Sequence, residues 1–217
     1  MKKLRFIFLS VFAFVFFSSF SGVDSGNWVL QKNEKGIVVY TRETPGSQIK
    51  EVRVINKVQS SLAGMVALLL DTRNYTNWIY QCTESQPLKV VSEKEMYNYQ
   101  VTNFPWPVSD RDLICDFRIH QDSVSKVVSF TKTAVPGYLP DKSPYVRIRD
   151  FESDYLLTPL PNDSMIVDLR MRVDPGGDIP TWLINANIVM APYKSTVAML
   201  NEVPKYQWAS YSFIREK

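Results

Sequence analysis

Few residues in this sequence are of a type that could support catalysis or metal binding, and their spacing does not form a catalytic or metal-binding motif. The chain of 217 residues has one histidine, His120, and two cysteines, Cys82 and Cys115. A zinc site needs several Cys or His ligands at short spacings, and a nucleophilic site needs a Ser or Cys beside a base. Neither grouping occurs, and no pair of the many acidic residues stands out. We therefore expect no catalytic site, no metal site and no cofactor.

The residues around His120 alternate in a way that predicts a strand with one apolar face. That face holds Leu113, Cys115, Phe117 and Ile119. Since alternate side chains of a strand point to opposite faces, His120 falls on the other face and we expect it to be solvated. Cys115 would act there as a small hydrophobic residue. Sequence cannot place the two sulfurs for a disulfide, and we favour two separate buried thiols at Cys82 and Cys115.

The first 21 residues have the order of a secretory signal peptide. A basic start, residues 1–5, precedes an apolar run, residues 6–17, and then small residues. The run is shorter than the roughly 20 residues that span a bilayer. We predict cleavage after Ser21 and a periplasmic or secreted protein, with an uncleaved membrane anchor as the alternative.

Removal of this segment changes the charge of the chain. It carries three basic residues and no acidic ones, so the formal net charge falls from +3 to zero. A neutral chain gives no electrostatic case for nucleic acid as a partner. The remaining length fits one domain with a sizeable core, which we place at residues 28–214 and expect to be monomeric.

The elements that would position a site follow from periodicity. Residues 36–41 and 49–58 have strand-like β-branched or alternating patterns. Ser60 or Ser61 can cap a helix whose apolar residues recur every three or four positions, as far as Leu70. From about residue 88 to 173, further strands with short turns predict an antiparallel meander, with separate strands at 145–151 and 153–158.

A long amphipathic helix is predicted to close this sheet. Asp178 can cap it, Pro180 lies in its first turn, and its apolar face extends to about Val203. Pro192 removes one backbone hydrogen bond, which predicts a kink. Either the kink lets the helix move against the loop at residues 136–144, or it is static and fits a curved sheet.

Four segments, in this order, resemble the START (StAR-related lipid-transfer) family. They are residues 71–78, the Trp-Pro turn and Ser-Asp-Arg-Asp of 104–112, residues 134–148, and residues 173–185. The resemblance implies an α+β helix-grip fold: a curved antiparallel sheet that encloses an apolar cavity under a long C-terminal helix. It implies a non-catalytic protein that binds, transfers or senses a lipid, with transient contact at a membrane surface. The alternatives are a cyclase- or hydrolase-like enzyme of the same superfamily, and a protein-interaction domain whose cavity is vestigial and filled with side chains.

Within these motifs, five residues are expected to have structural roles. Arg111 and Asp112 are neighbours in a strand, so they point to opposite faces and each needs another partner. Arg111 could brace a turn through a fork of hydrogen bonds. Gly176 and Gly177 permit positive φ where the last strand turns into the helix. Arg147 belongs to the third motif and is expected to be structural as well.

The predicted cavity lining comes from inward strand positions, loops and the apolar helix face. It comprises Tyr99, Trp106, Phe117, Tyr138, Leu183, Asn187, Met190 and Val197. Ordinary core packing is the alternative for each. Asn187 is an amide on an apolar face, so it could orient a ligand hydroxyl or carbonyl, or bond to a strand.

A phospholipid, a fatty acyl chain or a sterol-like molecule would suit such a cavity. Some sterol-binding members of the family carry a buried charge shortly after the Arg-Asp pair. Here the inward residues of 113–117 are apolar, which makes a sterol the less favoured ligand.

Overall fold

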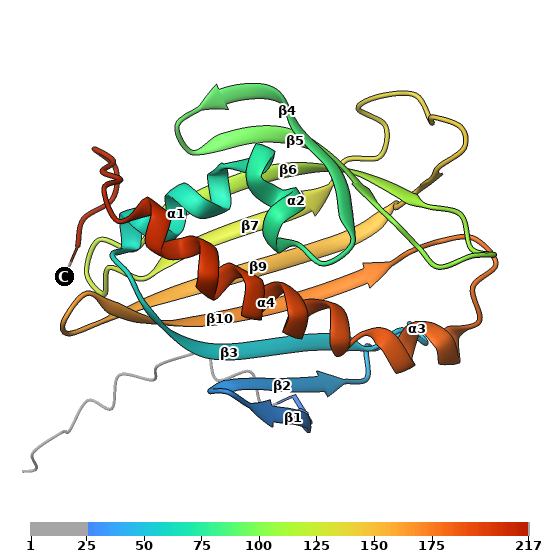
Figure 1. Cartoon of the computed structure of the whole chain (residues 1–217), viewed down its shortest axis with the longest axis horizontal. Coiled ribbons are helices and arrows are strands. Elements are labelled where there is room, and N and C mark those ends of the chain that lie inside the picture. The colour runs from blue at the N-terminus through green and yellow to red at the C-terminus, as the bar shows by residue number, and fades with distance from the viewer. Residues whose placement is uncertain (1–25, 217) are drawn as a thin grey trace, which may run out of the picture.

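One large antiparallel sheet forms the body of the protein, seen in a computed structural model that describes residues 26–216 (Figure 1). The signal peptide predicted at residues 1–21 lies outside the described residues. The strands are β1 (Val29–Glu34), β2 (Ile37–Arg42), β3 (Glu51–Gln59), β4 (Cys82–Ser92), β5 (Glu95–Thr102), β6 (Arg111–Gln121), β7 (Val128–Ala134), β8 (Val146–Arg147), β9 (Asp150–Leu160) and β10 (Ser164–Asp174).

The strand order is β1-β2-β3-β10-β9-β7-β6-β5-β4. Most neighbours in the sheet are also neighbours in the sequence, as a meander requires. Strands β7 and β9 pair across the short β8, and β3 pairs with the distant β10, from Gln59 opposite Ser164 to Val52 opposite Met171. The short β8 runs parallel to the first residues of β6, beyond the point where β7 ends. The predicted curved antiparallel sheet is thus confirmed.

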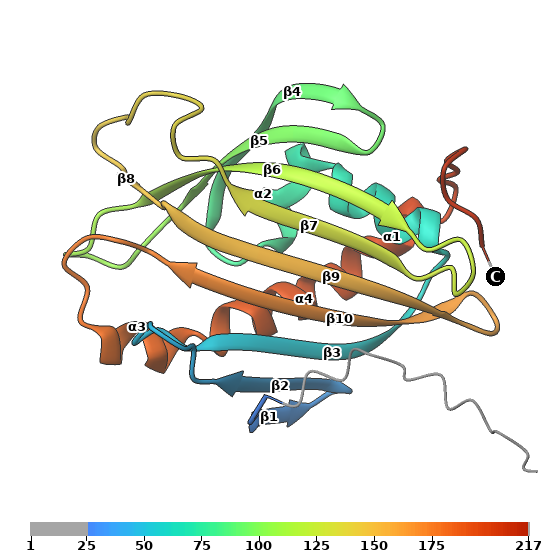
Figure 2. The ribbon, with the colours of Figure 1, turned by 180° about the vertical axis from the view of Figure 1, so that it is seen from behind.

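The helices formed by residues 26–216 lie on one face of the sheet, which we call the inner face, as the opposite views of Figures 1 and 2 show. They are α1 (Leu62–Leu70), η1 (Thr72–Asn74), α2 (Tyr75–Trp78), α3 (Thr181–Asn187), α4 (Met190–Glu202) and η2 (Val203–Tyr206). Ser61 caps α1, because its Oγ accepts a 3.0 Å hydrogen bond from the backbone N–H of Gly64. The main core lies between these helices and the sheet.

The closing helix is two helices, where the sequence predicts one. Helix α3 begins at Thr181 with Pro180 as its N-cap, so the predicted cap at Asp178 is wrong. Ile188 and Val189 separate α3 from α4. Pro192 explains the position of the break, since it has no N–H to donate to the carbonyl of Ile188. The predicted kink is therefore a break.

Some strands differ from the sequence prediction. Strand β1 and the first half of β4 were not predicted, because both are edge strands with irregular registers and largely exposed side chains. Alternation is lost in such strands, so periodicity does not detect them. Two strands do occur near the ones predicted at 145–151 and 153–158, but the boundary differs, because β8 ends at Arg147 and β9 already begins at Asp150.

Candidate ligand cavity under the closing helices

A cavity of about 500 Å³ lies between the inner face of the sheet and helices α3 and α4. Its wall is mainly apolar and includes Leu113, Phe117, Leu169, Met171, Leu183 and Ile188. Its rim, as we use the term, consists of Phe104, Pro105 and Val108 in the β5–β6 loop, with Pro175 and Ile179 before α3. The volume lies within the ~300–1,000 Å³ of typical ligand sites.

Four of the eight predicted lining residues border this cavity. They are Phe117 on β6, Leu183 and Asn187 on α3, and Met190 on α4. The Asn187 amide does not bond to a strand: its Nδ2 donates a 2.8 Å hydrogen bond to the carbonyl of Leu183, one turn earlier. Three of the four predicted helical residues therefore border the cavity, and Val197 does not.

Two predicted lining residues lie on the outer face of the sheet instead. Tyr99 packs with Val101 and Ile114 in a small separate core, while its neighbour Asn98 faces the cavity. Tyr138 stacks on Tyr97 with 4.6 Å between ring centres. A strand shows two faces, and the sequence did not reveal which one curves around the helices.

The same placement corrects the expected movement of the closing helix against residues 136–144. Three backbone carbonyls of this loop are bound by Arg147, whose partner Asp112 points away from the cavity. The loop therefore covers the outer face of the sheet, whereas α3 and α4 lie on the inner face. The helix cannot close against it.

The other two residues miss the cavity for different reasons. Trp106 is 92% exposed, while its loop neighbours Phe104 and Pro105 border the cavity. Val197 lies on α4, partly buried, and packs against the main core. Trp106 was misplaced because the direction of a loop side chain cannot be read from sequence. Val197 was misplaced because α4 extends past the cavity onto the core.

Arg111 holds the turn that leads from β10 into α3. The Nε and Nη2 atoms of this buried side chain donate to the carbonyls of Pro175 (3.1 Å) and Gly176 (2.8 Å), and Nη1 donates to that of Ser109. Gly176 and Gly177 have φ of +64° and +71°, and a Cβ on Gly177 would lie 3.1 Å from Arg111 Nη2. These contacts fix one side of the cavity rim.

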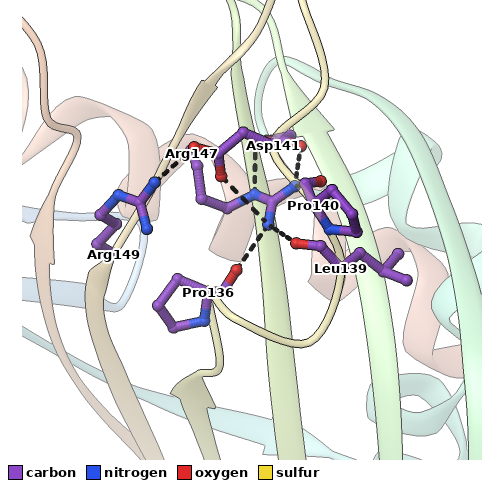
Figure 3. Close-up of polar contacts among 7 residues, drawn as sticks. Pro136, Leu139, Pro140, Asp141, Arg147 and Arg149 are labelled. Atoms are coloured by element: carbon purple, nitrogen blue, oxygen red, sulfur yellow. Dashed lines mark hydrogen bonds and ion pairs between the residues drawn. The ribbon is translucent and has the colours of Figure 1, made fainter.

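Asp112 points to the opposite face and pairs with Arg147. Two parallel hydrogen bonds join them, Nε to Oδ1 at 2.9 Å and Nη2 to Oδ2 at 2.8 Å, and both side chains are fully buried. Arg147 also donates to the carbonyls of Pro136, Leu139 and Pro140, as Figure 3 shows. The hydrogen bonds with Asp112 raise the pKa of Arg147 above its usual value. The pair therefore anchors the outer loop and lies away from the cavity.

Lys132 is a cavity residue that the sequence analysis missed. It lies on β7, is 5% exposed, and is the one charged side chain among the described residues that line the cavity. Its ammonium lies 4.5 Å from the ring centre of Tyr75, and 5.0 to 5.7 Å from those of Phe117, Tyr155 and Phe130. A signal was present, because Lys132 follows Val128 and Phe130 on the same face of a strand.

Three further polar atoms of the cavity wall are buried without a hydrogen-bond partner. They are Nε1 of Trp78, Oδ1 of Asn98 and Oγ of Ser153. Ser153 is directly opposite Lys132 in the pairing of β9 with β7. Native proteins rarely leave buried polar groups unpaired, so this cluster requires an explanation.

The histidine and the two cysteines differ in their exposure. His120 is exposed on β6, and Cys82 and Cys115 are buried free thiols. No cluster of three or more potential ligands in residues 26–216 is placed to hold a metal ion. Among the described residues, no helix is long and apolar enough to cross a bilayer.

A curved antiparallel sheet that grips a C-terminal helical segment around an apolar cavity defines the helix-grip fold. The chain belongs to the START domain family, whose model matches residues 17–204. It is 31% identical to the STAR-related lipid transfer protein of Xanthomonas axonopodis, whose crystal structure matches with a TM-score of 0.77 over 82% of this chain and 98% of that one.

Two further relatives are more distant. The phosphatidylcholine transfer protein of Rattus norvegicus is 25% identical over 167 residues, which are 73% of this chain and 75% of that protein. Human StAR-related lipid transfer protein 5 shares the fold, with a TM-score of 0.72 at 15% identity, over 85% of this chain and 89% of that one.

Proposed function

We propose that this protein binds a lipid in the cavity under α3 and α4 and carries it without chemical change. The observation that carries the proposal is an apolar cavity of about 500 Å³ that borders solvent at the rim. Enclosing an apolar chain gains roughly 25 cal/mol per Å² removed from water. The names of the relatives, a phosphatidylcholine transfer protein and STAR-related lipid transfer proteins, support the same function.

The chemistry of the wall supports a non-catalytic protein. Lys132 is the one charged group among the described lining residues, and no carboxylate or histidine joins it as an acid or base. Cys115 also lines the cavity, but burial raises the pKa of its thiol to about 12. The reactive thiolate is therefore scarcely populated at neutral pH.

Native mass spectrometry of the protein purified from its own host tests this proposal. We expect the mass of one chain plus a lipid. In the variant Ala191→Trp the larger side chain takes up part of the cavity and should reduce the fraction of protein that carries the added mass, because Ala191 lines the cavity. Asn201→Trp, at an exposed position of the same helix, is the matched control and should keep the lipid. A folded wild-type protein that carries no lipid and takes up none from vesicles would overturn the proposal.

The location of this function belongs to the proposal as well. We propose export by the segment at residues 1–21 and action in the periplasm or outside the cell, on the basis of its basic, apolar and small-residue order. Cell fractionation and N-terminal sequencing of the isolated protein test this. A cytoplasmic protein that starts at Met1 would contradict it.

Exposed tryptophans next to the rim support transient contact with a membrane. Trp106 is 92% exposed in the β5–β6 loop, and Trp182 is 72% exposed in α3. Tryptophan favours membrane–water interfaces. We expect the double variant Trp106→Ala/Trp182→Ala to lose binding to vesicles in a sedimentation assay. Trp208→Ala is the control, since Trp208 is 80% exposed but follows η2 at the far end of α4; equal loss in both variants would contradict the docking surface.

A further inference from the structure

The cavity contains a buried cation that no protein anion compensates. The Lys132 side chain is surrounded by aromatic rings: Tyr75 from α2, Phe117 from β6, Phe130 from its own strand and Tyr155 from β9. No Asp or Glu is among the described residues that line the cavity. Burying an unpaired ammonium is costly, and cation–π contacts of about 2 kcal/mol offset only part of that cost.

The titratable neighbours of Lys132 do not supply a negative charge. Burial raises the pKa of Cys82 to about 11 and that of Cys115 to about 12. Burial also raises the pKa values of the Tyr75 and Tyr155 hydroxyls. All four groups are therefore neutral near pH 7. The pKa of Lys132 is lowered by burial to about 8, so most of the ammonium remains charged there.

Two hydrogen-bond donors without partners line the same cavity. The Oγ of Ser153 is buried and unpaired, and Ser153 is the cross-strand partner of Lys132. Directly opposite residues have Cβ atoms about 5 Å apart, so both side chains can reach one ligand atom. The indole Nε1 of Trp78 is also buried, unpaired and in the cavity wall. One ammonium and two neutral donors form a set that a group with several acceptor oxygens would satisfy.

The arrangement disfavours a cationic group at this position. Aromatic rings attract quaternary ammonium ligands, but here the ammonium of Lys132 already lies over four of them. A choline group would meet a like charge.

We propose that Lys132 and Ser153 form an anion-binding subsite inside the cavity, and that the ligand is a lipid with a carboxylate or a phosphate monoester head group. This inference rests on the proposed lipid-binding function. Tyr75 and Phe130 belong to the core and not to the cavity wall, so the ammonium lies where the cavity meets the core. The head group enters first, and its apolar chain lies along the wall towards α3 and the rim.

Equilibrium binding of four probes to the delipidated full chain tests the subsite. Palmitic acid and lysophosphatidic acid carry the anionic group, methyl palmitate lacks the charge, and phosphatidylcholine carries the choline. We expect Lys132→Met to weaken the binding of at least one anionic probe by about 10- to 100-fold, the value of a charge-assisted hydrogen bond. Binding of methyl palmitate should be unchanged, and Lys132→Arg should keep the anionic preference. Which acid loses more affinity distinguishes a carboxylate from a phosphate.

The matched control is Lys142→Met. Lys142 also lies over two aromatic rings, 5.5 Å from Tyr99 and Tyr145, but on the exposed outer side of the sheet. It should leave all affinities unchanged. Equal affinity of wild type and Lys132→Met for both acids, or equal loss of the acids and the ester, would overturn the subsite. If the wild type binds none of the four probes, the lipid-binding function itself fails.

Discussion

At the scale of single residues, Arg147 and Lys132 show two ways to bury a cation. Arg147 has a carboxylate, Asp112, and three backbone carbonyls around its guanidinium. Lys132 has aromatic faces around its ammonium and no carboxylate. The first group is satisfied within the protein and stabilises the fold. The Lys132 ammonium has no such partner among the described residues of the cavity wall. Substitution of Lys132 and substitution of Arg147 should therefore change the stability of the fold in opposite directions.

Lys132→Met should stabilise the unliganded protein. Burial lowers the pKa of Lys132 from 10.5 to about 8, so the desolvation penalty applies in full below pH 8 and disappears as the pH rises to about 10.5. The upper bound of this desolvation penalty is about 3 kcal/mol. We expect a gain of about 1–3 kcal/mol in urea denaturation at pH 7, relative to wild type, and a smaller gain near pH 10. An equal gain at both pH values, or one also produced by Lys142→Met, would contradict the interpretation.

Arg147→Met should have the opposite effect. It leaves the buried Asp112 carboxylate without its partner and frees the carbonyls of the outer loop. Breaking such a pair costs about 3–5 kcal/mol, measured as a lower urea midpoint. The control is Arg149→Met, since Arg149 is largely exposed and pairs with the exposed Asp141. If the double variant Asp112→Asn/Arg147→Met recovered no stability, the unpaired carboxylate would not be the cause.

The sequence can predict the face on which a side chain lies only where the pattern within its own strand is sufficient to decide it. Adjacent positions in one strand sufficed to place Arg111 and Asp112 on opposite faces. Tyr99 was misplaced because choosing between it and Asn98 requires the register with β6, in which Met96 is opposite Phe117. That register depends on long-range pairing and not on local pattern.

At the scale of elements, α3 is a short helix that is fixed at its start and separated from α4 at its end. The Arg111 fork fixes the turn before it, and the break at Ile188 and Val189 separates it from α4. The side chain of Asn185 ties it to the chain before β3, accepting from the backbone N–H of Lys50 (3.1 Å) and donating to the carbonyl of Gln48 (3.0 Å). Few contacts would have to open for α3 to uncover the cavity.

Pro192→Ala should therefore slow lipid exchange. Alanine restores a donor for the carbonyl of Ile188, which favours one continuous helix in place of the break. Asn185→Ala should act in the opposite direction, because it removes two hydrogen bonds that tie α3 down. The transfer rate of a fluorescent lipid between vesicles measures both. Rates that are unchanged in both variants would show that α3 does not control entry.

The sequence predicted the site of the interruption but not its extent. Pro192 identifies the carbonyl that loses its donor, whereas the two residues that separate α3 from α4 depend on how each helix packs. Ile188 is buried in the main core and lines the cavity, so tertiary contacts set the geometry of the break.

At the scale of the whole molecule, the pairing of β3 with β10 joins the first and last parts of the sheet. The closing helices follow β10 directly, so the chain returns across the sheet it has just completed (Figure 1). Antiparallel order was predictable from the short turns. The β3–β10 pairing was not, because more than a hundred residues separate these strands.

A cavity enclosed in this way links the stability of the fold to its occupancy. A ligand that binds only the folded state stabilises it by about 2.7 kcal/mol at a free concentration of one hundred times its dissociation constant. We expect delipidation to lower the thermal midpoint of the wild type by several degrees, measured by calorimetry on loaded and delipidated protein. Ala191→Trp leaves less room for the lipid, so its midpoint should fall less than that of the wild type on the same treatment. Asn201→Trp should behave as the wild type does, and an equal loss in Ala191→Trp would mean that the stabilising lipid binds outside the cavity.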